Sequence, residues 1–115
     1  MRFAALLQEA ELALVVEGSH FDVRHRKAHR VLARVEDPAA VAELGCALRC
    51  VPEAPRMDWM MHGQPTVALF TSRRRYLAAV TVLRPDRVRS ESLLNGDALL
   101  AEPGRLITWL GSAGG

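Results

Sequence analysis

The chain has 115 residues, of which half are hydrophobic and 24% are charged. This composition is typical of a globular protein and excludes disorder over most of the chain. A fold of this length removes roughly two-thirds of its unfolded-chain surface from water, so neither a metal nor a disulfide is needed for stability. We therefore expect one globular domain over residues 1–115.

Cysteine content and the N-terminal segment predict the compartment. The two cysteines, Cys46 and Cys50, are too few for a secreted disulfide framework. Gln8, Glu9 and Glu11 interrupt the apolar N-terminal run where a signal peptide would be uniformly apolar. No segment reaches the roughly 20 apolar residues of a membrane span. We expect a cytoplasmic protein, and the use of arginine for all but one of the Lys and Arg positions is associated with GC-rich bacterial genomes.

The first predicted element is an amphipathic helix that ends near Gly18. Its apolar residues follow the i, i+3, i+4, i+7 spacing of one helical face. They are Phe3, Leu6, Leu7, Ala10 and Leu14. Two stretches of period-two alternation then predict strands over residues 20–24 and 30–36, the second with Val31, Ala33 and Val35 on one face.

A second helix is predicted to begin at Asp37-Pro38. Aspartate at the N-cap accepts free amide hydrogens, and proline at the first helical position loses nothing by lacking its own. Pro52 and Pro55 are expected to end this helix. Its inward face is predicted to contain Val41, Leu44, Leu48 and Val51.

The C-terminal half predicts a hairpin, further strands and a closing helix. Residues 65–85 contain β-branched and aromatic residues on both sides of a polar tip at residues 72–75. The sequence "DRVRSE" predicts a third strand, and Asn95-Gly96 predicts a turn. Pro103 is expected to open a short helix that Gly111 closes. Its inward residues are predicted to be Leu106, Ile107 and Leu110.

Strands that come as hairpins, rather than separated by helices, favour the α+β class. We expect a two-layer sandwich with a mainly antiparallel sheet of three to five strands and about three helices.

A histidine-rich stretch raises the possibility of a metal site. His25 and His29 are four residues apart, which on a helix places both imidazoles on one face, and His20, Asp22 or His62 could complete the ligand set. The stretch has no helix cap, and it lacks the zinc-peptidase pattern and any Cys-x-x-Cys. A solvated basic segment is therefore the favoured interpretation, and no cofactor is expected.

Cys46 and Cys50 are also four residues apart, within the second predicted helix. Their thiols could bind a soft metal, alone or with the histidines. A disulfide within one helical turn has poor geometry. Free cysteine is usually a small buried hydrophobe, so packing in or beside the core is favoured.

Charge is distributed in bands. Residues 24–34 and 59–90 each have a net charge of +5, and the segments between and around them are acidic. The candidate binding arginines lie in the second basic band. They are Arg73, Arg74, Arg75, Arg84, Arg87 and Arg89. Guanidinium groups bind carboxylates and phosphates in bidentate fashion, so an arginine-rich face could bind an acidic protein surface or nucleic acid.

Aromatic residues are sparse beside these arginines. Tyr76 is the single aromatic there, whereas binders of single-stranded nucleic acid interleave several aromatics with the charges. Trp59 and Met61, in "DWMMHG", could supply apolar anchors for a protein partner.

No nucleophile elbow, phosphate loop or dinucleotide fingerprint is present. The sequence therefore favours a non-catalytic bacterial interaction module, of accessory or immunity type, that binds an acidic protein partner. A nucleic-acid-binding regulator and a metal-dependent enzyme with a histidine site are the alternatives, and a homo-oligomer is possible.

Overall fold

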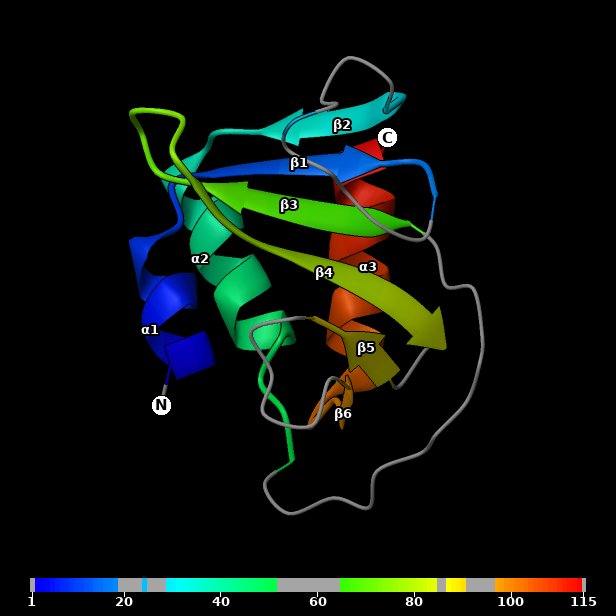
Figure 1. The fold of residues 1–115 in the computed structure, drawn as a ribbon. Coiled ribbons are helices and arrows are strands. Elements are labelled where there is room, and N and C mark those ends of the chain that lie inside the picture. Colours follow the sequence, from blue (N-terminus) through cyan, green and yellow to red (C-terminus); the bar gives the residue numbers. More distant parts are fainter. Residues whose placement is uncertain are drawn as a thin grey trace.

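An antiparallel sheet in the order β2-β1-β3-β4-β5-β6 runs through the molecule (Figure 1). The structure is a computed structural model that describes residues 2–18, 24, 29–51, 65–84, 87–90 and 97–114. Within these residues the strands are β1 (Leu12–Val16), β2 (Val31–Val35), β3 (Thr66–Phe70), β4 (Tyr76–Arg84), β5 (Arg87–Arg89) and β6 (Asp97–Leu99). The helices are α1 (Arg2–Glu9), α2 (Pro38–Ala47) and α3 (Pro103–Gly114). The α+β class and the antiparallel sheet are confirmed, and β6 adds one strand to the expected three to five.

The three helices lie on one face of the sheet, in agreement with the expected sandwich (Figure 1). On that face, inward residues of β1, β3, β4 and β5 pack against α2 and α3, whose buried side chains include Leu44, Leu106 and Trp109. A second cluster occupies the opposite face. It contains Leu12, Leu14, Val16, Ala68 and Phe70. β1 and β3 are therefore buried on both faces. Among the described segments, no helix combines the length and apolar character that a bilayer crossing requires.

The prediction of one opening helix as far as Gly18 was wrong. The helix ends at Glu9, and Leu12–Val16 forms a strand between β2 and β3. The apolar run "LALVV" satisfies helical spacing and strand burial equally well, because every position is apolar. Pairing with two neighbouring strands, and the β-branched pair Val15 and Val16, favour the strand.

The strand over Val31–Val35 and the start of α2 are confirmed. The Asp37 carboxylate accepts a hydrogen bond from the Ala40 N–H at 3.1 Å, and Pro38 is the first helical residue. Of the predicted inward face of β2, Ala33 and Val35 pack against the core, but Val31 is 50% exposed. The strand predicted over residues 20–24 lies outside the described residues, apart from Arg24.

α2 ends at Ala47, several residues before the predicted stop at Pro52. The chain leaves the helix to pair with the end of β6 and the residues that follow it. The Val51 N–H donates to the Leu99 carbonyl at 2.8 Å, and the Ala101 N–H donates to the Arg49 carbonyl at 2.8 Å. Val51 is consequently 37% exposed instead of lying on the helix face. A long-range pairing that local sequence does not reveal therefore decides this boundary.

The hairpin β3–β4, the strand β5 and the start of α3 are confirmed. Within α3 the inward stripe differs from the prediction, since Ile107 is 52% exposed and Trp109 is buried in its place. Leu106, Trp109 and Leu110 are spaced i, i+3, i+4, which places them on one helical face. The helix also continues past Gly111 to Gly114. The Asn95-Gly96 turn lies outside the described residues.

Candidate functional site

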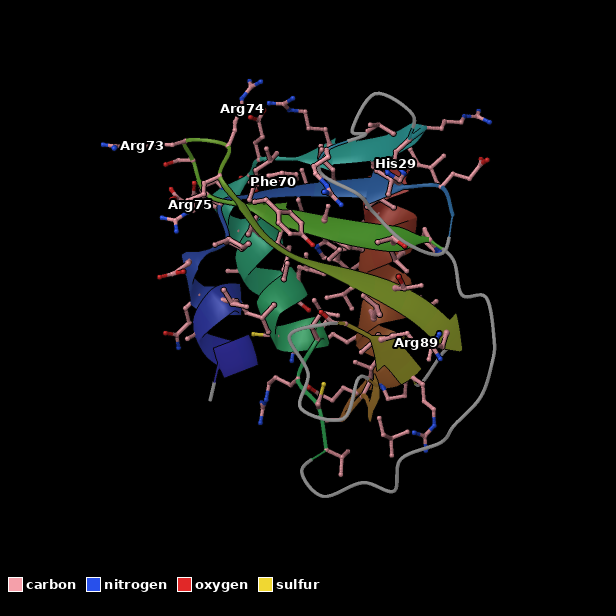
Figure 2. All side chains as sticks on the ribbon, viewed as in Figure 1. His29, Phe70, Arg73, Arg74, Arg75 and Arg89 are labelled. Carbon is pink, nitrogen blue, oxygen red and sulfur yellow. The ribbon has the colours of Figure 1, made fainter. Side chains whose placement is uncertain are left out.

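The hairpin tip, residues 71–75, projects three consecutive arginines from one corner of the sheet (Figure 2). Thr71 closes the tip: its N–H donates to the Arg75 carbonyl at 2.9 Å, its carbonyl accepts from the Arg74 N–H at 2.9 Å, and its hydroxyl accepts from the Arg75 N–H at 3.2 Å. Arg74 has φ of 64°, a left-handed conformation that glycine or asparagine usually takes in such loops. The side chains of Arg73, Arg74 and Arg75 are all exposed.

These three arginines differ from other arginines that form ion pairs within the fold. Arg34 donates to Glu36 at 3.1 Å, Arg30 lies 3.5 Å from Glu17, and Arg105 pairs with two glutamates. By contrast, none of the hairpin-tip side chains makes an ion pair with a described residue. The tip therefore exposes three guanidinium groups that form no ion pair within the described part of the chain.

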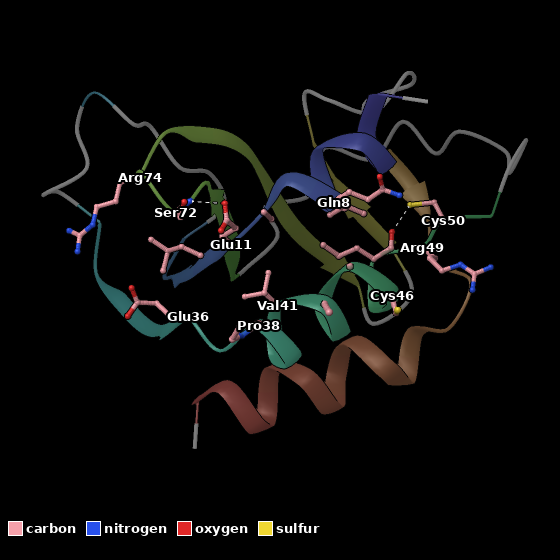
Figure 3. Close-up of a pocket in the computed structure, with 16 residues that line it drawn as sticks. Gln8, Glu11, Glu36, Pro38, Val41, Cys46, Arg49, Cys50, Ser72 and Arg74 are labelled. Atoms are coloured by element: carbon pink, nitrogen blue, oxygen red, sulfur yellow. Dashed lines mark hydrogen bonds between the residues drawn. The ribbon is translucent and has the colours of Figure 1, made fainter.

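Beside the tip, a groove of about 930 Å³ lies between α1, α2 and the hairpin (Figure 3). Its apolar walls come from the end of α1, the start of β1 and the exposed side of α2. The apolar lining residues are Leu7, Ala10, Leu12, Pro38, Val41, Ala42, Gly45 and Leu48. Arg74 and Ser72 line one end of the groove, and Cys46, Arg49 and Cys50 line the other. The groove thus joins an apolar wall directly to the hairpin-tip arginines.

Two carboxylates at the Arg74 end already have partners. Glu11 accepts a hydrogen bond from the Ser72 N–H at 3.2 Å (Figure 3), and Glu36 accepts one from Arg34 at 3.1 Å. The Arg34 hydrogen bond and charge, with a smaller contribution from Arg74, hold the pKa of Glu36 below its ordinary value. Arginines from both basic bands thus act on Glu36, so the two bands approach each other at this corner.

The two cysteines lie at the other end of the groove, but not on one helix as predicted. Cys46 belongs to α2 and is exposed, whereas Cys50 lies beyond the helix in a bridge to Leu100. The Cys50 thiol donates to the Leu48 carbonyl at 3.3 Å, and burial raises its pKa. Both thiols are free. The expected packing role fits Cys50 and does not fit the exposed Cys46.

The remaining candidate arginines lie at the far end of β4 from the hairpin tip. Arg89 is opposite Thr81 and Arg87 is opposite Arg84 in the strand register. Figure 2 shows Arg89 at the other end of the sheet from Arg73. The six arginines therefore do not form one continuous face. The Arg84 side chain, Trp59 and Met61 lie outside what the structure describes.

Of the four candidate histidine ligands, the structure describes His29, which is partly buried. His20, His25 and His62 lie outside the described residues, as does Asp22. Among the residues that are described, no three His, Cys, Asp or Glu side chains are close enough together to hold a metal ion.

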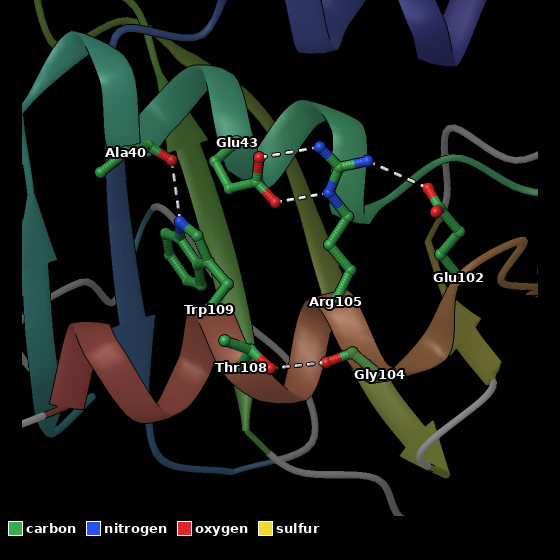
Figure 4. A network of polar contacts seen from close by, with 7 residues as sticks. All are labelled: Ala40, Glu43, Glu102, Gly104, Arg105, Thr108 and Trp109. Atoms are coloured by element: carbon green, nitrogen blue, oxygen red, sulfur yellow. Dashed lines mark hydrogen bonds and ion pairs between the residues drawn. The ribbon is translucent and has the colours of Figure 1, made fainter.

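Hydrogen bonds between α3 and α2 fix α2, one wall of the groove, in place (Figure 4). Arg105 donates through Nε and a terminal nitrogen to both carboxylate oxygens of Glu43, at 2.5 and 3.0 Å, and to Glu102 at 3.0 Å. The Trp109 indole N–H donates to the Ala40 carbonyl at 2.8 Å. The Arg105 hydrogen bond keeps the pKa of Glu43 below its ordinary value. α2 is thereby fixed to α3 while its opposite side remains open to the groove.

The sequence contains one signal for this groove that hydrophobic periodicity does not reveal. Ala42, Gly45 and Cys46 form a strip of small residues on α2 at i, i+3, i+4 spacing, which leaves room beside the helix. A Cβ atom built on Gly45 would have no neighbouring atom within 4 Å.

Compared with known proteins, the chain matches no family model, no curated protein and no solved structure.

Proposed function

We propose that this chain is a non-catalytic interaction module that binds an acidic segment of a protein partner. The hairpin-tip arginines bind the partner's carboxylates, and the groove takes the apolar side chains beside them. The observation that supports this most directly is that Arg73, Arg74 and Arg75 are exposed without an ion pair to any described residue, next to an apolar groove that Arg74 itself lines. Carboxylates meet guanidinium groups in bidentate geometry, and apolar anchors supply much of the affinity of protein interfaces.

A nucleic-acid ligand for the same arginines is the second candidate. Nucleic-acid binding of this kind needs exposed aromatic side chains, because proteins that bind single-stranded nucleic acid stack the bases on aromatic rings. Tyr76, the aromatic nearest the tip in sequence, packs edge-on against Phe70 with ring centroids 5.8 Å apart and is partly buried. The groove lining is mainly apolar, and Arg49 and Arg74 are its two basic residues. Both features favour an acidic peptide over a phosphate backbone.

The proposal includes a cytoplasmic location. Cys46 has an exposed thiol and Cys50 is unpaired, which suits a reducing compartment. This part of the proposal is independent of the hairpin tip and of the groove.

The test compares the affinity of the protein for fluorescent peptides that alternate glutamate with leucine and for single-stranded oligonucleotides of equal charge. Exposed charge pairs contribute roughly 0.2–1 kcal/mol each, so replacing Arg73, Arg74 and Arg75 by alanine is expected to weaken binding of the glutamate–leucine peptide by about 3-fold to about 150-fold. Arg87→Ala with Arg89→Ala, at the far end of β4, is the matched control and is expected to leave this affinity unchanged. A control pair that weakens binding equally would contradict the assignment of binding to the hairpin tip.

Gly45→Leu separates the groove from the tip. A Cβ atom at Gly45 has no neighbour within 4 Å, so we expect the fold to accept leucine there while its side chain occupies part of the groove. We expect weaker binding of the glutamate–leucine peptide and unchanged binding of a glutamate-only peptide. Tight oligonucleotide binding that depends on Arg73, Arg74 and Arg75 and is insensitive to Gly45→Leu would favour the nucleic-acid alternative. Peptide affinities that none of these substitutions changes would contradict both candidates.

A further inference from the structure

The groove follows one face of α2 along the length of the helix. The residues of α2 that line it recur at i, i+3, i+4, i+7 and i+8, which places them in a single stripe. They are Pro38, Val41, Ala42, Gly45 and Cys46. α2 has ten residues and is therefore about 15 Å long. An occupant that reaches from one end of the groove to the other spans about this distance.

A basic residue stands at each end of the groove. Arg74 and Glu36 line the end where α2 begins, and Arg49 lines the end just after α2. Figure 3 shows Arg74 and Arg49 at opposite ends of the groove. The backbone is fixed at both positions: the Arg74 N–H donates to the Thr71 carbonyl at 2.9 Å, and the Arg49 carbonyl accepts from the Ala101 N–H at 2.8 Å. The two positive charges therefore have defined places about one helix length apart.

The Arg74 end stays positive although two carboxylates lie in its lining. Glu36 pairs with Arg34 at 3.1 Å, and Glu11 accepts from the Ser72 N–H at 3.2 Å. Arg34 and the three hairpin-tip arginines outnumber these two carboxylates. An acidic side chain is therefore favoured at this end, as it is beside Arg49 at the other.

The groove offers a helix a better fit than an extended peptide. Among the described strands, β1 reaches the lining through Leu12, and β1 is already paired on both sides with β2 and β3. An extended peptide would thus bury backbone groups without strand partners, which costs free energy, whereas a helix bonds its own backbone internally. The small residues Ala42, Gly45 and Cys46 also let a second helix approach α2 closely.

We propose that the groove binds an amphipathic helix of the partner protein that has an acidic residue at each end of its apolar stripe. This inference rests on the proposed function and specifies the form of the acidic segment. Two acidic residues about eleven positions apart lie on the same helical face and are separated by about 16 Å, so one meets Arg74 and the other meets Arg49. Apolar residues between them, at i+3, i+4, i+7 and i+8, face the groove.

Charge reversal at Arg49 tests the second acidic contact. The probe is an alanine-based fluorescent peptide with two glutamates and the intervening leucines at this spacing. Arg49→Glu replaces an attraction by a repulsion, so we expect it to weaken binding by about 2-fold to about 30-fold. A peptide with lysine in place of one glutamate is expected to regain affinity for this variant. Arg89→Glu, at the far end of the sheet, is the matched control and is expected to change neither affinity.

Proline at the centre of the same peptide tests the helix. Proline removes a backbone hydrogen bond and clashes with the preceding turn, so we expect binding to weaken at least about tenfold. An affinity that proline leaves unchanged would indicate an extended ligand and overturn the inference. An affinity that Arg49→Glu leaves unchanged would also overturn it. So would a groove filled by a second copy of the chain, seen in light scattering as a mass of twice 12.7 kDa that falls when peptide is added.

The alternating glutamate–leucine peptide separates failure of this inference from failure of the proposed function. If its binding still depends on Arg73, Arg74 and Arg75 while either the proline or the Arg49→Glu result is negative, the helix inference is wrong and the proposed function stands. Loss of that dependence would contradict both.

Discussion

The hydroxyl oxygens of Thr66 and Thr81 lie 2.9 Å apart, buried on directly opposed positions of β3 and β4. Thr66 Oγ1 also lies 3.0 Å from the carbonyl of Gly18, to which it donates. A hydroxyl has one hydrogen, so Thr81 must be the donor in the pair with Thr66. The two threonines therefore connect the turn after β1 to β4 through a directed chain of hydrogen bonds.

Thr66→Val is expected to reduce the free energy of unfolding by about 1–3 kcal/mol, because it leaves the Gly18 carbonyl and the Thr81 hydroxyl without their Thr66 partner. Urea denaturation of both proteins measures the difference. Thr108→Val is the control, since the Thr108 hydroxyl is exposed and donates within α3 to the Gly104 carbonyl at 3.0 Å. Equal losses for the two variants would show that the buried hydroxyl chain contributes nothing specific.

Gly45→Ala is expected to stabilise the protein by about 0.5–1 kcal/mol. Glycine inside a helix has more conformational freedom to lose on folding than alanine, and the added Cβ would meet no atom within 4 Å. Thermal unfolding measures the effect. Gly18→Ala provides the contrast, because Gly18 has φ of 109° and alanine there is strained, so a loss of stability is expected. A lower melting temperature for Gly45→Ala would mean that α2 has less free space than the structure shows.

Cys46 is expected to react with iodoacetamide faster than Cys50 near pH 8. The Cys46 thiol is exposed, whereas the Cys50 thiol is partly buried, donates to the Leu48 carbonyl, and has a pKa raised by burial. The thiolate is the reactive species, so a raised pKa and reduced access both slow the reaction. Peptide mass spectrometry after timed quenching gives the order of labelling. If Cys50 reacted as fast in the folded protein as it does after denaturation, the assignment of its thiol as protected would be contradicted.

Glu43→Gln is expected to destabilise the protein at neutral pH and to lose that effect in acid. Arg105 holds the pKa of Glu43 below its ordinary value of 4.5 in the folded state. The ion pair therefore stabilises the fold above that value, and its contribution disappears as the pH falls through the lowered pKa. Urea denaturation of both proteins at pH 7 and near pH 3 measures the difference. Added salt at pH 7 should also shrink it, since both side chains are partly exposed. A difference that is the same at both pH values would contradict the ion-pair assignment.

Local signals predicted those elements whose ends are determined by chemistry within a few residues. The Asp37-Pro38 cap placed the start of α2, Pro103 placed the start of α3, and the polar tip between two β-branched runs placed the β3–β4 hairpin. The hairpin pattern also predicted that Arg73, Arg74 and Arg75 lie at the tip. In each case the backbone groups that need partners are satisfied locally, so the sequence pattern determines the element.

Tertiary pairing decided the rest. "LALVV" is apolar at every position, so only its place between β2 and β3 makes it a strand. The end of α2 depends on the Arg49–Val51 backbone finding Leu99 and Ala101, some 50 residues away in the chain. Tertiary structure also places Arg89 and Arg73 at opposite ends of the sheet and puts Arg74 in the same groove lining as Glu36. By itself the sequence determined composition, class and capped ends, because these follow from neighbours in the chain. The groove and the grouping of charges come from contacts between distant segments, and only the tertiary structure decides which of those form.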